Sequence, residues 1–214
     1  PILYNMAKRF DNPICYPGEG DFLTIINLES DPFLKFKGET GHDVSTQLIG
    51  DYNFNNVAAA LCIGKHFNVL MDVAEQAVAD YVPENNRSQV IKKGTNTVIL
   101  DAYNANPSSM KAAISNLIGM NAPNKMVILG DMMELGDESD ESHIEIVKLT
   151  NNNVQSTLLV GPLMVNASSA NSNAKPFKDK AQLYNYLKEQ EIENTTILIK
   201  ASRSLGLEEL VDAL

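Results

Sequence analysis

The hydrophobic positions follow two patterns, which divide the chain near residue 86. After that point, short continuous apolar runs alternate with longer stretches in which apolar residues recur at helical spacing. Continuous runs of this length predict strands buried on both faces, and the longer stretches predict amphipathic helices. The predicted strands are TVIL (97–100), KMVIL (125–129), STLLV (156–160) and TTILIK (195–200). The predicted helices are residues 108–120, 142–151, 180–190 and 206–214.

The first part of the chain has shorter runs separated by turn-forming residues. A polar segment led by Pro83 ends it, so we place a domain boundary there, between residues 1–86 and 87–214. The alternation of strands and helices beyond the boundary predicts an α/β fold, with a Rossmann-like, mostly parallel sheet covered on both faces. The first part has two predicted β-rich runs, 21–29 and 32–38, and two predicted helices, 55–67 and 71–81.

Charge and cysteine content exclude several classes of function. The 214 residues include 17 basic and 27 acidic side chains, a net charge of -10, and the basic ones form no block. A nucleic acid or an anionic membrane is therefore a poor partner, although a small anionic ligand is not excluded. No apolar stretch approaches the roughly 18 residues of a membrane helix, so we expect no membrane insertion. Cys15 and Cys62 form no metal or redox motif, which favours the cytoplasm and buried or inert thiols.

Polar residues follow the first predicted strand of the second part. They are Asp101, Asn104 and Asn106, with Tyr103 among them. One side-chain oxygen is enough to cap a helix, so this group exceeds what capping requires. An acid at a strand end suits ribose hydroxyls and an aromatic ring suits a base, and ligands of parallel sheets bind at this edge. Capping and turn formation are the alternative explanation for each residue taken singly.

Charged groups follow two further strands. Asp131 and Glu134 come after KMVIL, and we expect His143, at the start of the next helix, to be solvated. Lys200 and Arg203 could clamp a carboxylate or a phosphate, or could be surface charges. The sequence contains no G-x-x-x-x-G-K-[ST], G-x-G-x-x-G, G-x-S-x-G or H-E-x-x-H. Taken alone, these residues define neither a standard phosphate-binding loop nor a nucleophile.

Three strings along the chain resemble the Mur ligase family. DAYNANPSSM (101–110), LGDMMELGDESDESH (129–143) and KASR (200–203) are similar, in order and spacing, to D-S-Y-N-A-N-P-x-S-M, L-G-D-M-x-E-L-G-x-x-S-x-x-x-H and K-G-S-R. Ala201 stands where the family has Gly. Upstream, GDYNFNNVAAALCIG (50–64) is similar to the end of the family's central domain, with Tyr52 in place of a His. The resemblance therefore assigns residues 1–86 to the tail of a central ATP-binding domain and 87–214 to a C-terminal domain.

The resemblance implies an ATP-dependent amide-bond ligase of peptidoglycan synthesis. The branch it favours adds D-Ala-D-Ala to UDP-N-acetylmuramoyl-tripeptide through an acyl phosphate. It implies ATP and Mg²⁺ as cofactors. The family's residues that bind Mg²⁺, and its G-x-x-G-K-[ST] phosphate-binding loop, lie mainly upstream of the matching region. We therefore expect these 214 residues alone to be inactive, and we assign no catalytic or metal-ligating residue among them. We also expect a monomer.

The resemblance also assigns site residues by position. Nucleotide contacts would come from Asn56 at the adenine, Arg87, Asp101 at the ribose hydroxyls and Tyr103 near the base or phosphates. The residues facing the dipeptide would be Asn104, Asn106, Asp131, Glu134, Lys200, Ser202 and Arg203.

Other interpretations fit parts of the sequence. A sister Mur ligase or a folylpolyglutamate synthase would share the domain plan, but the YNANP and ELG strings favour the dipeptide-adding branch. A non-catalytic α/β module that binds a small acidic ligand or a partner protein belongs to a different class, and a P-loop upstream in the gene would argue against it. A dinucleotide-dependent oxidoreductase fits the α/β pattern but lacks the glycine fingerprint.

Overall fold

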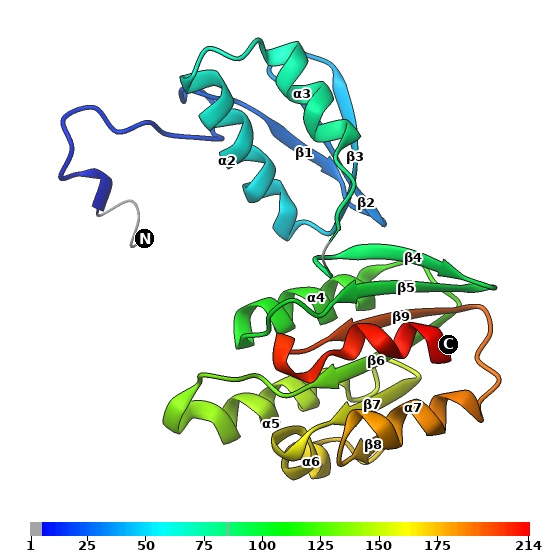
Figure 1. Cartoon of the computed structure of the whole chain (residues 1–214). Helices are drawn as coiled ribbons and strands as arrows, with labels where there is room; N and C mark the ends of the chain where they lie inside the picture. Colours follow the sequence, from blue (N-terminus) through cyan, green and yellow to red (C-terminus); the bar gives the residue numbers. More distant parts are fainter. Residues whose placement is uncertain (1–5, 85) are drawn as a thin grey trace. The chain divides into compact units, whose positions relative to one another are not determined.

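A short antiparallel sheet and two helices form unit 1, Pro1–Tyr81 (Figure 1). The structure is a computed structural model that describes residues 6–84 and 86–214. The strands pair in the order β1-β2-β3, and both neighbouring pairs are antiparallel. The elements are β1 (Ile26–Glu29), β2 (Phe33–Lys37), β3 (Asp43–Ile49), α2 (Tyr52–His66) and α3 (Met71–Asp80).

The core of unit 1 lies between one face of this sheet and the two helices. Alternate residues of β2, Leu34 and Phe36, are fully buried, which is the pattern of a sheet with one covered face. They pack with a stripe of α2 that includes Val57 and Leu61. Burial raises the pKa of the Cys62 thiol in the same cluster, whereas Cys15 is exposed. The two predicted helices are confirmed; β3 was not predicted.

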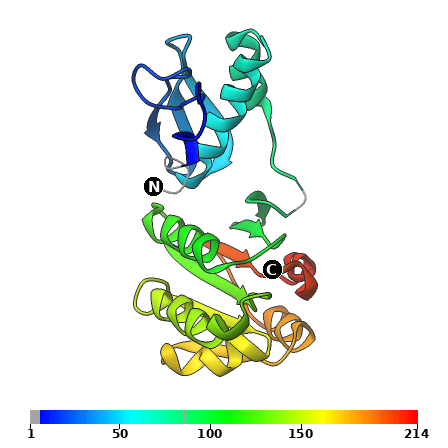
Figure 2. The ribbon, with the colours of Figure 1, turned by 90° about the vertical axis from the view of Figure 1, so that its left-hand side faces the viewer.

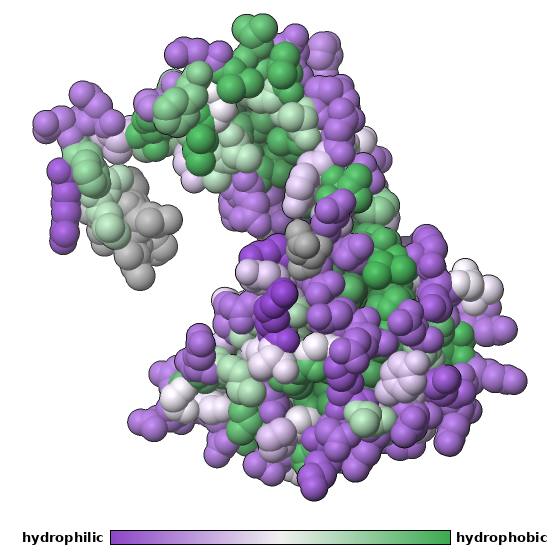
Figure 3. Space-filling view, viewed as in Figure 1, coloured by the Kyte–Doolittle hydropathy of each residue, from purple (hydrophilic) through white to green (hydrophobic). Residues whose placement is uncertain are grey.

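Large apolar side chains are also exposed on unit 1. Figure 3 shows hydrophobic residues gathering over α2 and α3. The exposed apolar residues at the end of α2 and the start of α3 are Ile63, Phe67, Val69, Leu70 and Val73.

A six-stranded sheet organises unit 2, Val82–Leu214. The strand order is β4-β5-β9-β6-β7-β8; β4 is antiparallel to β5, and every other neighbouring pair is parallel. The strands are β4 (Gln89–Lys93), β5 (Asn96–Asp101), β6 (Asn124–Gly130), β7 (Ser156–Val160), β8 (Ala174–Phe177) and β9 (Thr195–Lys200). The helices are α4 (Pro107–Gly119), α5 (Ser139–Thr150), α6 (Pro162–Ala167) and α7 (Lys180–Lys188), with short 3-10 helices η1 (Gly136–Glu138), η2 (Ser168–Ala170), η3 (Arg203–Leu205) and η4 (Leu207–Ala213).

Helices cover both faces of this sheet. α4, α5 and α6 lie on one face, and α7 and η4 on the other (Figure 2). Val98 and Leu100 of β5 belong to the cluster that packs under α7 and η4, while Ile99 between them is also buried. Because successive side chains point to opposite faces, burial on both faces requires the continuous apolar runs seen in the sequence. The prediction of an α/β fold with a mostly parallel sheet is confirmed.

Several element predictions need correction. The four predicted strands of unit 2 are confirmed, as are the helices that became α4, α5 and α7. The predicted helix at 206–214 is a 3-10 helix, η4. β4, α6 and β8 lie in segments that were not predicted as elements.

The division between the units falls between Tyr81 and Val82. The boundary predicted at residue 86 lies slightly later, and residue 85 is outside the described residues. The assignment of the first part to an ATP-binding domain stays a prediction. Across the part of the chain that the structure describes, no helix is both long and apolar enough to cross a membrane.

Candidate functional site

The site predicted from the sequence lies at the edge of unit 2 where the parallel strands end. β5, β9, β6 and β7 are parallel neighbours, so their carboxyl ends meet at one edge of the sheet. We name the connections that follow three of these strands the β5 loop (residues 102–106), the β6 loop (131–135) and the β9 loop (201–202).

An ion pair joins the ends of the two central strands. Asp101 and Lys200 are register partners on β5 and β9. Lys200 Nζ donates to Asp101 Oδ2 over 2.6 Å and to the backbone oxygen of Asn104 over 3.0 Å. The lysine side chain is 2% exposed and the aspartate side chain 17%. An unpaired charge at such a buried position would cost several kcal/mol, so the pair fixes both the carboxylate and the start of the β5 loop.

The segment before β4 is tied to the same loop by its backbone. Ser88 N donates to Asp101 Oδ1 over 3.2 Å, and Tyr103 N donates to the carbonyl oxygen of Asn86 over 3.2 Å. Asn86 and Ser88 have φ of 60° and 49°, in the left-handed region that is uncommon for residues other than glycine. Backbone bonds therefore hold this segment against the carboxyl end of β5.

Two guanidinium groups lie against the ring of Tyr103. Arg87 Cζ is 3.7 Å from the ring centroid and Arg203 Cζ is 5.1 Å from it, both within the range of a cation–π contact. Both arginines are exposed, and Tyr103 is half-buried. The structure thus brings together three predicted site residues from the segment before β4, the β5 loop and η3.

The two asparagines of the β5 loop are partly used by the backbone. Asn106 is the N-cap of α4: its Oδ1 accepts from Ser109 N over 2.9 Å, and Ser109 Oγ accepts from Asn106 N over 3.1 Å. Pro107 occupies the first helical position, where its missing N–H is not needed. Asn104 Oδ1 accepts from Ala105 N over 2.9 Å. Both asparagines are exposed.

Asp131 at the start of the β6 loop is buried and supports a neighbouring helix. It is 1% exposed, and its Oδ1 accepts from Met164 N in the first turn of α6 over 2.8 Å. A carboxylate is favourable at this place because the first N–H groups of a helix lack helical partners. Gly161, with φ of 104°, passes so close that a Cβ there would lie 2.5 Å from Asp131 Oδ2. Substrate contact by Asp131 stays a prediction.

The next two N–H groups of the β6 loop are bound by side chains from other elements. Met132 N donates to His143 Nε2 of α5 over 2.9 Å. Met133 N donates to Ser202 Oγ of the β9 loop over 2.9 Å, and Ser202 N donates to the backbone carbonyl oxygen of Asp131 over 3.1 Å. The expectation that His143 is solvated was wrong, because its side chain is fully buried. The family string 129–143 ends at this His, but residue type does not give its role, since its partner is a backbone group that only the fold supplies.

The predicted site residues of unit 2 thus fall into three groups by the exposure of their side chains. Those with exposed side chains are Arg87, Asn104, Asn106, Glu134 and Arg203. Those that are buried and engaged within the protein are Asp131, Lys200 and Ser202. Asp101 and Tyr103 are half-buried between them. Asn56 belongs to α2 of unit 1, is exposed, and donates to Asn53 Oδ1 over 3.0 Å.

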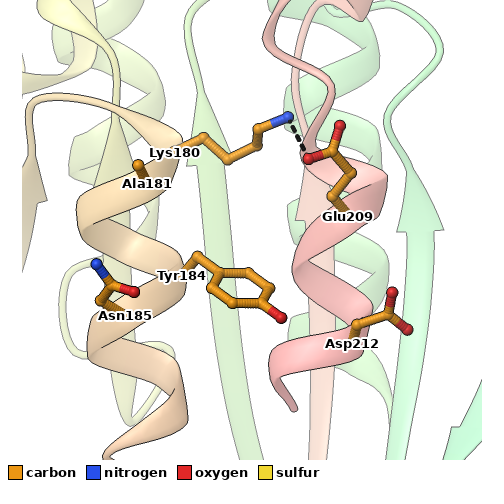
Figure 4. A pocket seen from close by; sticks show the side chains of 6 residues that line it. All are labelled: Lys180, Ala181, Tyr184, Asn185, Glu209 and Asp212. Carbon is orange, nitrogen blue, oxygen red and sulfur yellow. Dashed lines mark ion pairs between the residues drawn. The ribbon is translucent and has the colours of Figure 1, made fainter.

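A groove elsewhere on unit 2 does not include these residues. It lies between α7 and η4, with a volume of about 390 Å³ (Figure 4). Lys180 and Glu209 face each other across it in an ion pair of 2.8 Å. The other lining residues are Ala181, Tyr184, Asn185 and Asp212. Within residues 6–84 and 86–214, no three His, Cys, Asp or Glu side chains are grouped so as to hold a metal ion.

Sequence comparison shows the class of protein to which the chain carrying this site belongs. Residues 86–203, more than half of the chain, match the family described as "Mur ligase, glutamate ligase domain". The chain therefore belongs to the Mur ligase family. All the predicted site residues of unit 2 lie within the matching region.

Individual relatives narrow the comparison to one branch of the family. The chain is 30% identical over 204 residues to UDP-N-acetylmuramoyl-tripeptide–D-alanyl-D-alanine ligase of Bacillus subtilis, covering 90% of this chain and 42% of that protein. It is 33% identical over 178 residues to the same ligase of Escherichia coli, covering 80% and 39%. The fold matches that of the MurF ligase of Thermotoga maritima, solved in complex with ADP, with a TM-score of 0.81 over 100% of this chain and 50% of that one, at 21% identity. The chain thus spans about two fifths of the length of these curated relatives.

Proposed function

We propose that this chain acts in an ATP-dependent ligase that adds D-Ala-D-Ala to UDP-N-acetylmuramoyl-tripeptide. The observation that carries the proposal is the meeting of three motif strings, far apart in sequence, at one edge of one sheet. The named relatives, which carry out this reaction according to their names, support the choice of substrates.

The proposed reaction makes one amide bond at the cost of one ATP. The terminal carboxylate of the tripeptide attacks the γ-phosphorus of ATP, ADP leaves, and an acyl phosphate forms. The amino group of D-Ala-D-Ala then attacks the acyl carbon, phosphate leaves, and the amine nitrogen loses a proton. Mg²⁺ would supply neutralisation of phosphate charge when bound. We assign it no ligand among the described residues.

The nucleotide would bind at the carboxyl end of β5 and the residues beside it. Each carboxylate oxygen of Asp101 accepts one bond within the protein, from Lys200 and from Ser88 N. A carboxylate oxygen has two acceptor positions, so capacity is left for ribose hydroxyls. The ring of Tyr103 and the guanidinium of Arg87 would offer flat faces to a base or charge to phosphates. Asn56, on unit 1, is proposed as an adenine contact on the family resemblance alone.

Dipeptide binding would use the exposed members of the group. Arg203 can bind the carboxylate of the dipeptide with two parallel hydrogen bonds, and Glu134 can attract its amino group. Asn104 and Asn106 would add amide contacts from the β5 loop. Lys200, Asp131 and Ser202 are buried, so they would hold the loops in place rather than reach far into the solvent.

The proposal extends to the partners, the cellular compartment and the oligomeric state of the enzyme. The net charge of -10 argues against a nucleic-acid partner. We propose a cytoplasmic, monomeric protein without membrane insertion.

A ligation assay tests the proposal. The complete product of the gene that encodes this sequence, and the 214-residue chain beside it, would be incubated with ATP, Mg²⁺, UDP-N-acetylmuramoyl-tripeptide and D-Ala-D-Ala, and products weighed by mass spectrometry. We expect the pentapeptide product from the gene product and none from the 214 residues alone. Single amino acids in place of the dipeptide distinguish a sister ligase, and absence of any product would favour a non-catalytic binding module.

A further inference from the structure

Two consecutive backbone N–H groups of the β6 loop donate to side chains of other elements. The Met132 N–H donates a hydrogen bond to His143 on α5 over 2.9 Å. The Met133 N–H donates to Ser202 in the β9 loop, also over 2.9 Å. Both acceptors are buried, with His143 at 0% and Ser202 at 5% exposure. Two different elements therefore hold the loop at adjacent positions, and we call these two hydrogen bonds, Met132–His143 and Met133–Ser202, the clamp.

The hydrogen bonds of His143 define its tautomer. Nε2 accepts from the Met132 N–H, so it carries no hydrogen. Nδ1 lies 2.7 Å from the backbone oxygen of Ser139, which can only accept, so Nδ1 carries the hydrogen. The ring is thus the neutral Nδ1–H form. A hydrogen on Nε2 would face the Met132 N–H and abolish the bond to the loop.

The clamp presents the next part of the loop to solvent. Met133 is 44% exposed although it is a large apolar residue. Glu134 is exposed and has φ of 64°. A residue other than glycine persists in this region only where its surroundings hold it, and such residues cluster at functional sites. The clamp at Met132 and Met133 supplies that constraint.

We propose that His143 is a positioning residue, which as the Nδ1–H tautomer holds Met133 and Glu134 in the conformation that contacts the incoming amine substrate. The Glu134 carboxylate would attract the amino group, and Met133 would pack against a small apolar side chain. This substrate role rests on the proposed ligase function, whereas the clamp itself does not.

The tautomer is tested on the chain as it stands. A long-range ¹H–¹⁵N spectrum of the 214-residue protein at neutral pH distinguishes the two nitrogens of each imidazole. We expect the signals of His143 to show a hydrogen on Nδ1 and none on Nε2. A ring protonated on Nε2, or on both nitrogens, would overturn the proposal.

Three variants distinguish a His143 that accepts the hydrogen bond of the clamp from a His143 that only fills space in the core. His143→Phe keeps a ring but has no acceptor, His143→Gln has a side-chain oxygen able to reach the position of Nε2, and His143→Asn is too short to do so. With Ile128 in β6 as the internal reference, we expect hydrogen exchange of the Met132 amide to rise about tenfold in the Phe and Asn variants, the effect of one lost buried hydrogen bond. The Gln variant should restore slow exchange. Equal acceleration at Met132 and Ile128, or none at Met132, would overturn the clamp.

Kinetics test the substrate role separately. In the complete gene product, His143→Phe should raise KM for D-Ala-D-Ala about tenfold, leave KM for ATP nearly unchanged, and be rescued by His143→Gln. Equal changes in both constants would overturn the positioning role. If the unaltered protein forms no product, the proposed function and the substrate role fail together, while the exchange data still decide whether His143 clamps the loop.

Discussion

Lys200 Nζ lies 2.6 Å from Asp101 Oδ2, although the two residues are 99 positions apart in the sequence. The contact exists because β9 inserts beside β5 in parallel register, so that both strands end at the same level. It places a buried cation under the carboxylate that we propose for ribose binding. The same pair therefore serves the stability of unit 2 and the geometry of its candidate site, and the two contributions can be separated by substitution.

Asp101→Asn should destabilise unit 2 by roughly 3 to 5 kcal/mol, because it leaves the buried Lys200 without an anionic partner. Urea unfolding of the 214-residue chain measures the change. Adding Lys200→Met removes the uncompensated charge, so the double variant should be more stable than Asp101→Asn alone.

The matched control is an exposed pair. Lys111 and Glu145 are 2.7 Å apart with side chains about half exposed, so Lys111→Met should destabilise the protein much less than Asp101→Asn does. A loss at Lys111 equal to that at Asp101 would contradict the importance of burial.

Gly161→Ala should destabilise unit 2 by about 1 to 3 kcal/mol or more, because φ is 104° there and the new Cβ would meet the Asp131 carboxylate. Gly119→Ala is the control, since it lies at the end of α4 with open space around it. That change should be neutral or stabilising by up to about 1 kcal/mol. Thermal unfolding of the two variants decides the matter, and an equal shift in Tm would refute the steric argument.

Asn106→Ala should cost about 1 kcal/mol through loss of the α4 N-cap, whereas Asn106→Asp should keep the cap and its stability. If Asn106 also contacts the dipeptide, the Asp variant will raise KM for D-Ala-D-Ala without a loss of stability. Denaturant unfolding followed by ligation kinetics separates the two roles. Ala and Asp variants of equal stability would show that the cap contributes little.

The ionised carboxyl group of Asp51 should stabilise unit 1, and this stabilisation should be lost in acid. The hydrogen bond from Ser30 and then that from Asn27 lower the pKa of its carboxyl group in the folded protein. Since the folded pKa is below the unfolded value of about 3.9, the stabilisation is present above that value and is lost as pH falls through the folded pKa.

The comparison is between the chain and its Asp51→Asn variant, unfolded with urea at mildly acidic and at strongly acidic pH. The difference in unfolding free energy should shrink as the carboxyl group becomes protonated. A difference that does not change with pH would rule out the carboxylate as its source.

The strands that could be predicted are those whose two faces are both buried. Val98, Ile128 and Ile197 lie in continuous apolar runs because helices cover both sides of their strands. Edge strands lack this signal. Three of the five residues of β4 are polar, and β8 contains Pro176, a residue confined in sheets to edges and irregular positions. α6 is only six residues long, too short for helical periodicity to be visible.

For the site, the sequence predicted which residues lie near the edge but not which side chains face outward. Asp131 and Glu134 are similar in type and separated by two residues, yet the first is buried against Gly161 and the second is exposed. His143 shows the limit most clearly. Its partners are the backbone groups of Met132 and Ser139, and backbone groups leave no trace in residue type.

The position of β9 has a consequence for synthesis on the ribosome. It lies between β5 and β6, yet it follows every other strand along the chain. The growing polypeptide therefore emerges with the middle of its sheet missing, and the edges of β5 and β6 that pair with β9 leave backbone N–H and C=O groups unpaired until residues 195–200 leave the exit tunnel. The complete sheet of unit 2 can therefore form only after its last strand has been synthesised, and a nascent chain stalled before β9 would be a target for chaperones.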